Sequence, residues 1–539
     1  MAVPQFTTPG VQIQELNAFP NSVVPVATAI PAFIGYTARA DYKGKSYANV
    51  PVEITSLQEF LLYFGALDPS DPSGNTPLPD NQQYKPIYCV TPVGKNATQP
   101  ADIVGPTGQG YYVQPDPATV YYLYNSIKLY YLNGGGTCYV VSIGEWNTTP
   151  TFKPFAPTTA TPNLVNTYVS AADLQVGLNA IAQEADPTMI VIPDALLLTP
   201  GDNAKINGLV LQQCSTLMSR VGIFDLPGAD DPDPTQFMNQ VILPFRNAIG
   251  LNGLNYGIAY YPFLMTSVMD PEDIDFNNFG GSSKLAPILG NAPAVTALLG
   301  QMSTATYGAP PPGATTPSVT QVENALRNTL QFYQQLHDFV LNDRANVLPP
   351  SGAMAGAYTM VDDQKGVWHA PANISLVAVN DTTQKMTDAL QGPLNVDAAT
   401  GKSINVIRTF PGKGVVVWGA RTLDGNSQDW RYVNVRRTLI MVEQSLKLAA
   451  FSYVFEPNDE NTWSLVSSML SNFLTSLWAE GALVGPTPAS AFSVAVGLGV
   501  TMTPDDILNG IMRVAVKVAV SHPAEFILIT IEQQQQQAG

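Results

Sequence analysis

The chain has few of the side chains that most catalytic sites need, and those few are scattered. Its three histidines, His337, His369 and His522, fall in three different sequence contexts, with no HExxH, GxSxG or paired-histidine metal spacing. Asp194 and Asp225 each follow an apolar run, at the strand ends where α/β enzymes often place carboxylates. Because neither has a recognisable histidine or metal-ligand partner, capping and turn formation are the favoured roles, and an α/β enzyme built on residues 187–227 is the alternative.

Cysteine and glycine patterns point away from bound cofactors. Cys89, Cys138 and Cys214 lie far apart without a CxxC pair, which argues against a disulfide framework and against a thiolate zinc site. The glycines at 134–136 follow a helical pattern and precede a β-branched run, whereas a phosphate-binding loop follows a strand and precedes a helix. We therefore expect no enzymatic activity, no cofactor and no metal site.

Four arginines stand close together in an otherwise acidic chain. An anion site is one interpretation, but we favour pairing with carboxylates, within a subunit or between subunits. The four are Arg421, Arg431, Arg436 and Arg437.

Each end of the chain has a strand-like segment set off by proline. Near the N-terminus Val11 and Ile13 alternate with Gln12 and Gln14, and near the C-terminus the run 525–531 is densely apolar. The unpaired N–H and C=O groups of an exposed strand are a template for pairing, so both segments are predicted to act as strand arms between subunits; pairing within their own domain is the alternative. The arm residues are Val11, Gln12, Ile13, Gln14, Glu15, Phe526, Ile527, Leu528, Ile529, Thr530 and Ile531.

Composition indicates a large, folded, acidic protein. The 539 residues suggest several domains at roughly 150 residues each, and 45% hydrophobic against 12% charged residues leaves much surface for subunit contacts. A formal charge of −17 would repel a nucleic-acid backbone. The sequence begins without a signal-peptide pattern and contains no apolar run of the roughly 20 residues that span a bilayer, so we expect synthesis in the cytoplasm and no membrane insertion.

The apolar periodicity predicts a mixed α+β and α/β, multidomain fold. Strands are predicted at 32–37, 138–143, around 189 and 221, and near 256, with a parallel α/β unit at 187–265. Helices are predicted after a Ser56 cap, up to Leu132, over 319–342, through 439–449 and over 460–482. Residues 68–117, rich in Pro, Gly, Asn and Asp, are expected to have little regular structure.

Several long motifs resemble contractile tail sheath proteins, both of phage tails and of extracellular contractile injection systems. These are TPGVQIQELNAFPNSVVPVATAIPAFIGYT from residue 8, LNGGGTCYVV, GVWHAPAN at 366–373, and VVWGARTLDGNSQDWRYVNVRRTLIMVEQSL. The resemblance touches 8–37, 118–143 and 366–531, while the middle of the chain is not covered. A single sheath chain with this N-terminal arm favours the extracellular or phage-like branch over a type VI-like one.

The resemblance implies a discontinuous inner sheath domain with inserted outer domains. It places an N-terminal arm at 1–24, the inner domain at 25–90 plus 360–520, outer insertions at 91–359, and a C-terminal arm with a polar tail at 521–539. It also implies hexameric rings stacked helically around an inner tube, with baseplate and terminal cap proteins as further partners, in a phage tail or a related particle assembled in a bacterial cytoplasm. The helix at 460–482 is a candidate for facing the tube. A non-contractile self-assembling shell or an adhesion protein remains the main alternative.

Overall fold

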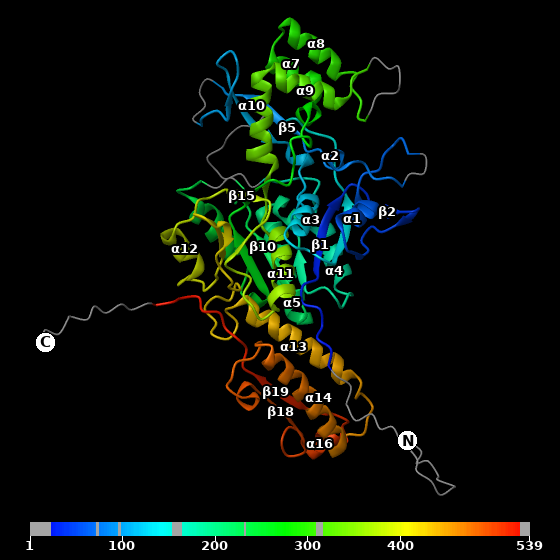
Figure 1. Cartoon of the computed structure of the whole chain (residues 1–539), viewed down its shortest axis with the longest axis vertical. Coiled ribbons are helices and arrows are strands. Elements are labelled where there is room, and N and C mark those ends of the chain that lie inside the picture. The colour runs from blue at the N-terminus through cyan, green and yellow to red at the C-terminus, as the bar shows by residue number, and fades with distance from the viewer. Residues whose placement is uncertain are drawn as a thin grey trace, which may run out of the picture. The chain divides into compact units, whose positions relative to one another are not determined.

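The computed structural model describes residues 23–71, 75–94, 99–153, 164–230, 233–308 and 316–528. The chain forms two compact units, a larger one of residues 27–440 with 522–539 and a smaller one of residues 1–26 with 441–521 (Figure 1). The division falls inside helix α13 (Val433–Phe451). The chain therefore passes between the two units three times, after residues 26, 440 and 521.

A nine-stranded sheet forms the centre of the larger unit. Strand β1 pairs in parallel with β8 and with β9, and the parallel pairing continues through β10 and β11 to β16. At the two edges β4, β17 and β14 pair antiparallel. In sheet order the strands are β14 (Ile374–Ser375), β17 (Gly414–Val417), β16 (Asn405–Phe410), β11 (Gly257–Tyr261), β10 (Val221–Asp225), β9 (Met189–Val191), β1 (Pro31–Thr37), β8 (Cys138–Glu145) and β4 (Val52–Ile54).

Helices cover both faces of this sheet, which is why its central strands are apolar without alternation. On one face Phe33 of β1 packs edge-on against Tyr130 of α3 (Leu123–Leu132), with ring centroids 5.3 Å apart, and α11 (Ser351–Lys365) lies against α3. The next residue, Ile34, points to the other face. There α4 (Ala171–Ile181) approaches so closely that a Cβ on Gly177 would lie 2.6 Å from the Ile34 side chain. Helix α5 (Pro200–Leu217) packs beside α4.

The structure confirms several of the predicted elements of this unit. Ser56 caps α1 (Leu57–Phe64) by accepting a hydrogen bond from the Glu59 amide at 3.2 Å. Gly134 follows α3 with φ at +92°, a conformation that favours glycine, and so ends the helix before β8. The β9–α5–β10 segment is the expected parallel α/β unit, and β11 follows it.

A second apolar core in the larger unit differs from two sequence predictions. Residues 68–117 were expected to be irregular, but they contain a three-stranded sheet of β5 (Tyr88–Pro92), β7 (Gly110–Pro115) and β6 (Ile103–Val104), because Tyr112 and Val113 are buried. The helix expected over 319–342 is broken at Leu330, where φ is −117° and ψ is 96°. It forms α9 (Val319–Thr329) and α10 (Gln331–Val340), which pack with α7 (Gly281–Leu289) and α8 (Pro293–Met302).

The units do not follow the domain boundaries expected from the sequence. Strands from 25–90, from the expected insertion 91–359 and from 360–520 all lie in the nine-stranded sheet. A boundary after residue 90 would separate β1 from β8 and β9, its hydrogen-bonded neighbours. The structure instead assigns 441–521 to one unit and 27–440 to the other.

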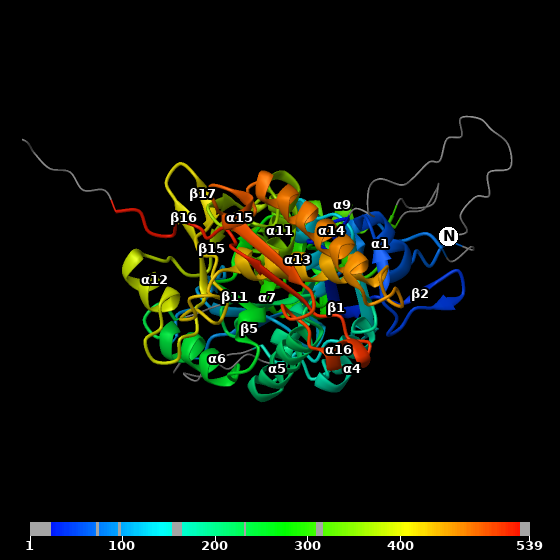
Figure 2. The same cartoon turned by 90° about the horizontal axis from the view of Figure 1, so that it is seen from below.

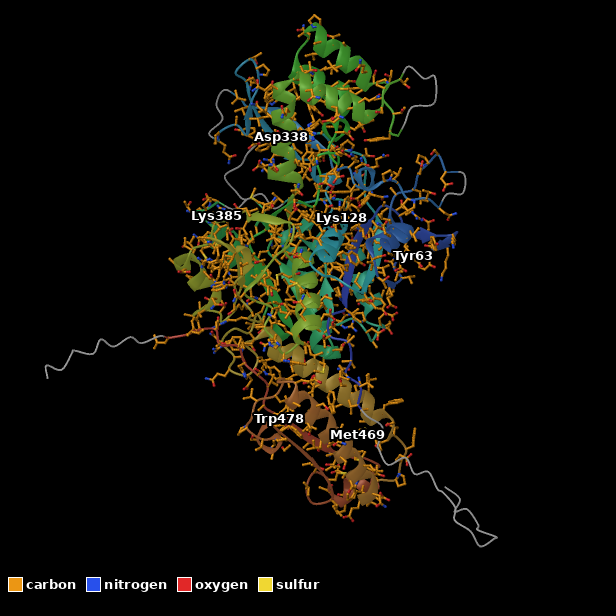
Figure 3. All side chains as sticks on the ribbon, viewed as in Figure 1. Tyr63, Lys128, Asp338, Lys385, Met469 and Trp478 are labelled. Carbon is orange, nitrogen blue, oxygen red and sulfur yellow. The ribbon has the colours of Figure 1, made fainter. Side chains whose placement is uncertain are left out.

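The smaller unit is built on two helices and a strand pair. Asp459 caps α14 (Glu460–Ala479) through the Thr462 amide, and Met469 and Trp478 lie on this helix (Figure 3). After α14 come α15 (Pro488–Ala491), β18 (Phe492–Val496), α16 (Pro504–Leu508) and β19 (Val514–Val518). The predicted helix over 460–482 is thus confirmed.

The remaining elements all belong to the larger unit. They are β2 (Asp41–Tyr42), β3 (Lys45–Ser46), α2 (Asp80–Gln83), α6 (Leu243–Ala248), β12 (Leu264–Thr266), β13 (Val347–Leu348), β15 (Val379–Thr382) and α12 (Asp388–Asn395). Within the described residues no helix is both long enough and apolar enough to cross a membrane.

Candidate inter-subunit interface

The β18–β19 pair is the sheet of the smaller unit. The strands pair antiparallel from Phe492 opposite Val518 to Val496 opposite Val514. In the described part of the chain they form a two-stranded sheet with no further strand. Two strands are marginal on their own in water, so this sheet depends on what packs beside it.

One face of the pair lies on α14, as Figures 1 and 2 show. Val494, Val514 and Val516 pack against the buried core of Val466, Met469 and Leu470. All three valines stay only partly buried, because α14 covers one face and the strand edges are open. On the opposite face Ala515 and Lys517 are exposed. The sheet therefore has one apolar face and two edges to which a further strand could add.

The smaller unit also exposes many large apolar side chains. Phe451, near the end of α13, is 76% exposed, and Phe455 in the following turn is fully exposed. Exposed apolar area of this extent is typical of a surface that another chain covers. The exposed set comprises Leu448, Phe451, Val454, Phe455, Leu465, Val484, Leu498, Val500, Leu508 and Ile511.

The N-terminal arm residues Val11, Gln12, Ile13, Gln14 and Glu15 lie outside the described residues. The chain is described from Val23, which packs on the core of the smaller unit. Next to it, the Val26 amide donates to Ser445 Oγ at 3.0 Å.

The C-terminal arm begins at an ion pair and continues as an exposed apolar run. Phe526, Ile527 and Leu528 are 76%, 79% and 92% exposed and lie in no strand of this chain. The remaining arm residues Ile529, Thr530 and Ile531 are outside the described part. Three consecutive large apolar side chains in water are costly, so a partner that buries them would be strongly favoured.

The four arginines have different contacts, and two of them pair with carboxylates. Arg421 pairs with Glu525 at 2.6 Å, and Arg437 pairs with Asp362 at 2.6 Å. Arg436 lies over the rings of Tyr256 and Trp430, 4.8 and 4.4 Å from the centroids, and Arg431 lies 5.9 Å from the Tyr432 centroid.

Burial and hydrogen bonding act in opposite directions on Glu525. Burial raises the pKa of its carboxyl, but the hydrogen bonds from Arg421, Asn395 and Tyr432 outweigh burial and lower that pKa below its ordinary value. The carboxylate is therefore held in its charged form. Glu525 and Asp362 were not singled out from the sequence, because an acidic partner 104 or 75 residues away leaves no local pattern.

The carboxylates considered for catalysis are structural. Asp194 is fully buried and accepts hydrogen bonds from the amides of Tyr36, Tyr122 and Leu123 at 2.7–3.2 Å. Burial raises its pKa to about 6, and burial raises that of Asp225, which accepts from the Ser351 amide, to about 7. The cavity beside Asp225 holds only about 10 Å³, too little for a substrate.

The histidines and cysteines likewise stay apart. His337 is buried, with Nε2 3.1 and 3.2 Å from the carbonyl oxygens of Pro271 and Ile274. Burial raises the pKa of each cysteine thiol to about 12, which keeps the thiols protonated. In the described ranges no three His, Cys, Asp or Glu side chains are placed to hold a metal ion.

Part of this chain is similar in sequence to phage tail sheath proteins. A family model of the phage tail sheath C-terminal domain matches residues 426–534, which include the whole 441–521 segment of the smaller unit. The tail sheath protein of Vibrio phage KVP40 is 28% identical over 136 residues, 25% of this chain and 20% of that protein. The tail sheath protein of Burkholderia phage BcepMu is 27% identical over 140 residues, 25% of this chain and 29% of that protein.

Solved structures extend the likeness to the full length. One match is the sheath of PVC, an extracellular contractile injection system, in its contracted state. This match covers 99% of each of the two chains, with a TM-score of 0.55 and 24% identity. The contracted helical sheath of the anti-feeding prophage gives a TM-score of 0.55 with 24% identity, over 98% of this chain and 100% of the other. The resemblance to contractile tail sheath proteins is confirmed.

The sequence matches cover a small part of the chain, whereas the structural matches cover nearly all of it. The matches to curated tail sheath proteins span 20% and 29% of those relatives, while the mixed α/β sheath fold extends over nearly all of this chain. These relatives are structural tail sheath proteins and not enzymes, in agreement with the prediction that the chain has no catalytic role.

Proposed function

We propose that this chain is the structural subunit of a contractile sheath, in a phage tail or a phage-tail-like injection particle. The β18–β19 pair carries the proposal. It is an apolar two-stranded sheet with open edges, in the region that matches the phage tail sheath C-terminal domain. Strand arms from neighbouring copies would complete this sheet.

The energetics favour such strand addition. An added strand forms about five backbone hydrogen bonds at about 0.5–1.5 kcal/mol net each. Burial of the arm side chains that face the acceptor sheet, such as Ile527, which is exposed in the single chain, adds about 1.5–3 kcal/mol for each side chain. Ordering the arm costs about 1–2 kcal/mol per residue, which opposes these gains.

In the proposed assembly, hexameric rings stack helically around an inner tube. On contraction the subunits move outward while the donated arms keep neighbours linked, and the tube is driven through a target envelope. A coupling free energy of roughly 1–3 kcal/mol per subunit becomes large when many subunits switch together, so no nucleotide hydrolysis is needed. Baseplate and terminal cap proteins would complete the particle, and α14 is a candidate for facing the tube.

Domain roles follow from the two units. We infer that the unit containing 441–521 is the inner, assembling part, because the exposed apolar side chains and the open sheet are concentrated there. The larger unit, whose central sheet has helices on both faces, would carry the outward-facing surface.

Deletion of residues 1–16 tests the arm mechanism. We expect a folded, soluble subunit that does not polymerise, because the core of each unit lies outside the deleted residues. Electron micrographs of the full chain should show cylinders of two lengths, extended and contracted. Normal cylinders from the truncated chain would refute the arm mechanism, and particles of one length only would favour a non-contractile shell.

A further inference from the structure

Three side chains donate hydrogen bonds to the carboxylate of Glu525. Arg421 donates from Nε at 2.9 and 3.1 Å to the two carboxylate oxygens and from Nη2 at 2.6 Å. Asn395 Nδ2 donates at 2.7 Å and the Tyr432 hydroxyl at 3.0 Å. One residue later the chain is exposed, so the change from a held chain to an exposed apolar run occurs directly after Glu525.

A second arginine–carboxylate pair holds the chain where it enters the larger unit from the N-terminal side. Arg437 donates from Nη1 and Nη2 to the two oxygens of Asp362 at 2.9 and 2.6 Å, and Nη2 also donates to the Thr28 carbonyl at 2.8 Å. The Thr28 hydroxyl donates to the same Asp362 carboxylate at 2.6 Å. The two side chains of this ion pair are only 3% and 5% exposed.

Both arginines connect to neighbouring residues of the central strand β11. The Arg421 amide donates to Asn405 Oδ1 at 2.7 Å, and Asn405 Nδ2 donates to the Ala259 carbonyl at 3.2 Å. The Arg437 guanidinium lies over the Tyr358 ring, 4.7 Å from its centroid, and the Tyr358 hydroxyl lies 2.6 Å from that of Tyr260.

We propose that Arg421 and Arg437 anchor the roots of the two strand arms, fixing Glu525 and Thr28 to the nine-stranded sheet of the larger unit. Bidentate guanidinium–carboxylate pairs resist displacement in direction as well as distance, which suits a point where a chain is pulled. A pull on the C-terminal arm then acts on the folded sheet at β11, and a force that passes the contacts of Val23 and Val26 and reaches Thr28 acts on the same strand. This inference rests on the proposed sheath function, in which the arms link neighbouring subunits.

The anchor at Glu525 can be tested in the dilute, unassembled full chain. A nitroxide is attached at Ala524→Cys, an exposed position next to the anchor; the native cysteines are buried. With Glu525→Gln we expect the label's rotational correlation time to fall several-fold, because the amide cannot hold both guanidinium nitrogens as an anion does. Asp388→Asn is the matched control, since it removes a carboxylate from the Arg408 pair where that carboxylate is 96% exposed. An unchanged correlation time in Glu525→Gln would overturn the proposal.

The N-terminal anchor has a parallel test with a nitroxide at Ala27→Cys, also exposed. Arg437→Lys keeps the charge but loses the bidentate grip, and we expect the label to become more mobile while Arg408→Lys has no effect. Equal mobility in the two variants would remove Arg437 from the proposal.

Assembly experiments then test the anchor proposal separately from the proposed sheath function. Cylinders of Glu525→Gln should form but break into short pieces on contraction or in mild urea, where unaltered cylinders stay whole. A mobile label combined with cylinders as robust as the unaltered ones would show that the ion pair does not serve the arm. If the full arm deletion of 526–539 also leaves cylinders unaffected, the strand-donation function itself fails, whatever the label shows.

Discussion

Ile527 provides a direct measure of what the C-terminal arm contributes to assembly. Its side chain is 79% exposed in the single chain, so Ile527→Ser should leave the unfolding temperature of the subunit unchanged. In a donated strand successive side chains face opposite sides. Residues 527, 529 and 531 are all isoleucine, whereas 528 shares its side with Thr530, so the isoleucine side is expected to face the apolar surface of the acceptor sheet.

The expected cost follows from the area that assembly would bury. Full burial of one such side chain is worth about 1.5–3 kcal/mol, so the serine variant should lose about 2 kcal/mol per junction. At 1.4 kcal/mol for each tenfold change, the critical concentration for cylinder formation should rise about 30-fold. Sedimentation across a concentration series measures it, with Leu528→Ser as the control for the opposite side. Polymerisation of Ile527→Ser at the unaltered critical concentration, or a larger effect of Leu528→Ser, would refute the reasoning.

Two further predictions concern the larger unit. Arg437→Ala leaves Asp362 buried without its partner and should cost about 3–5 kcal/mol of unfolding free energy, whereas Arg408→Ala, from an ion pair exposed on its carboxylate side, should cost about 1 kcal/mol or less; urea unfolding measures both. Asp225 has a pKa raised by burial from 3.8 to about 7, so its ionisation opposes folding, and stability from this group is lost as the pH rises from about 4 through 7. Asp225→Asn should therefore stabilise the fold at pH 8 by a few kcal/mol at most and change little at pH 4; equal effects at both pH values would contradict this assignment.

Local signals in the sequence predicted most of the individual elements. The run at 31–37, the Ser56 cap and the glycine after α3 are all short-range features, and the structure has each of them. The helix break at Leu330 was not foreseen, because apolar periodicity continues across it. Tyr333, just beyond the break, donates to the buried Glu323 at 2.7 Å, a contact that periodicity does not reveal.

The grouping of elements into units could not be predicted in the same way. Strands β1 and β16 lie more than 350 residues apart in the chain and in one sheet, and strand order depends on pairing that no local pattern encodes. For the same reason the arginines were recognisable as ion-pair formers, while their partners Glu525 and Asp362 were not. Long-range pairs of this kind become visible only when the fold brings the two side chains together.

The sheets of the two units differ in how far the chain itself covers them, and that difference bears on how a sheath could work. The central sheet of the larger unit is covered by helices on both faces, and its strand β1 is buried along its whole length. In the β18–β19 pair, by contrast, the valines of the apolar face are only partly buried, and no further strand pairs with these two in the described part of the chain. Because the β18–β19 pair has apolar surface left to cover, we expect it to accept the donated strands, while the larger unit supplies the C-terminal arm. The larger units would then be free to change their mutual arrangement without breaking the strand junctions, which is what shortening of a connected cylinder requires.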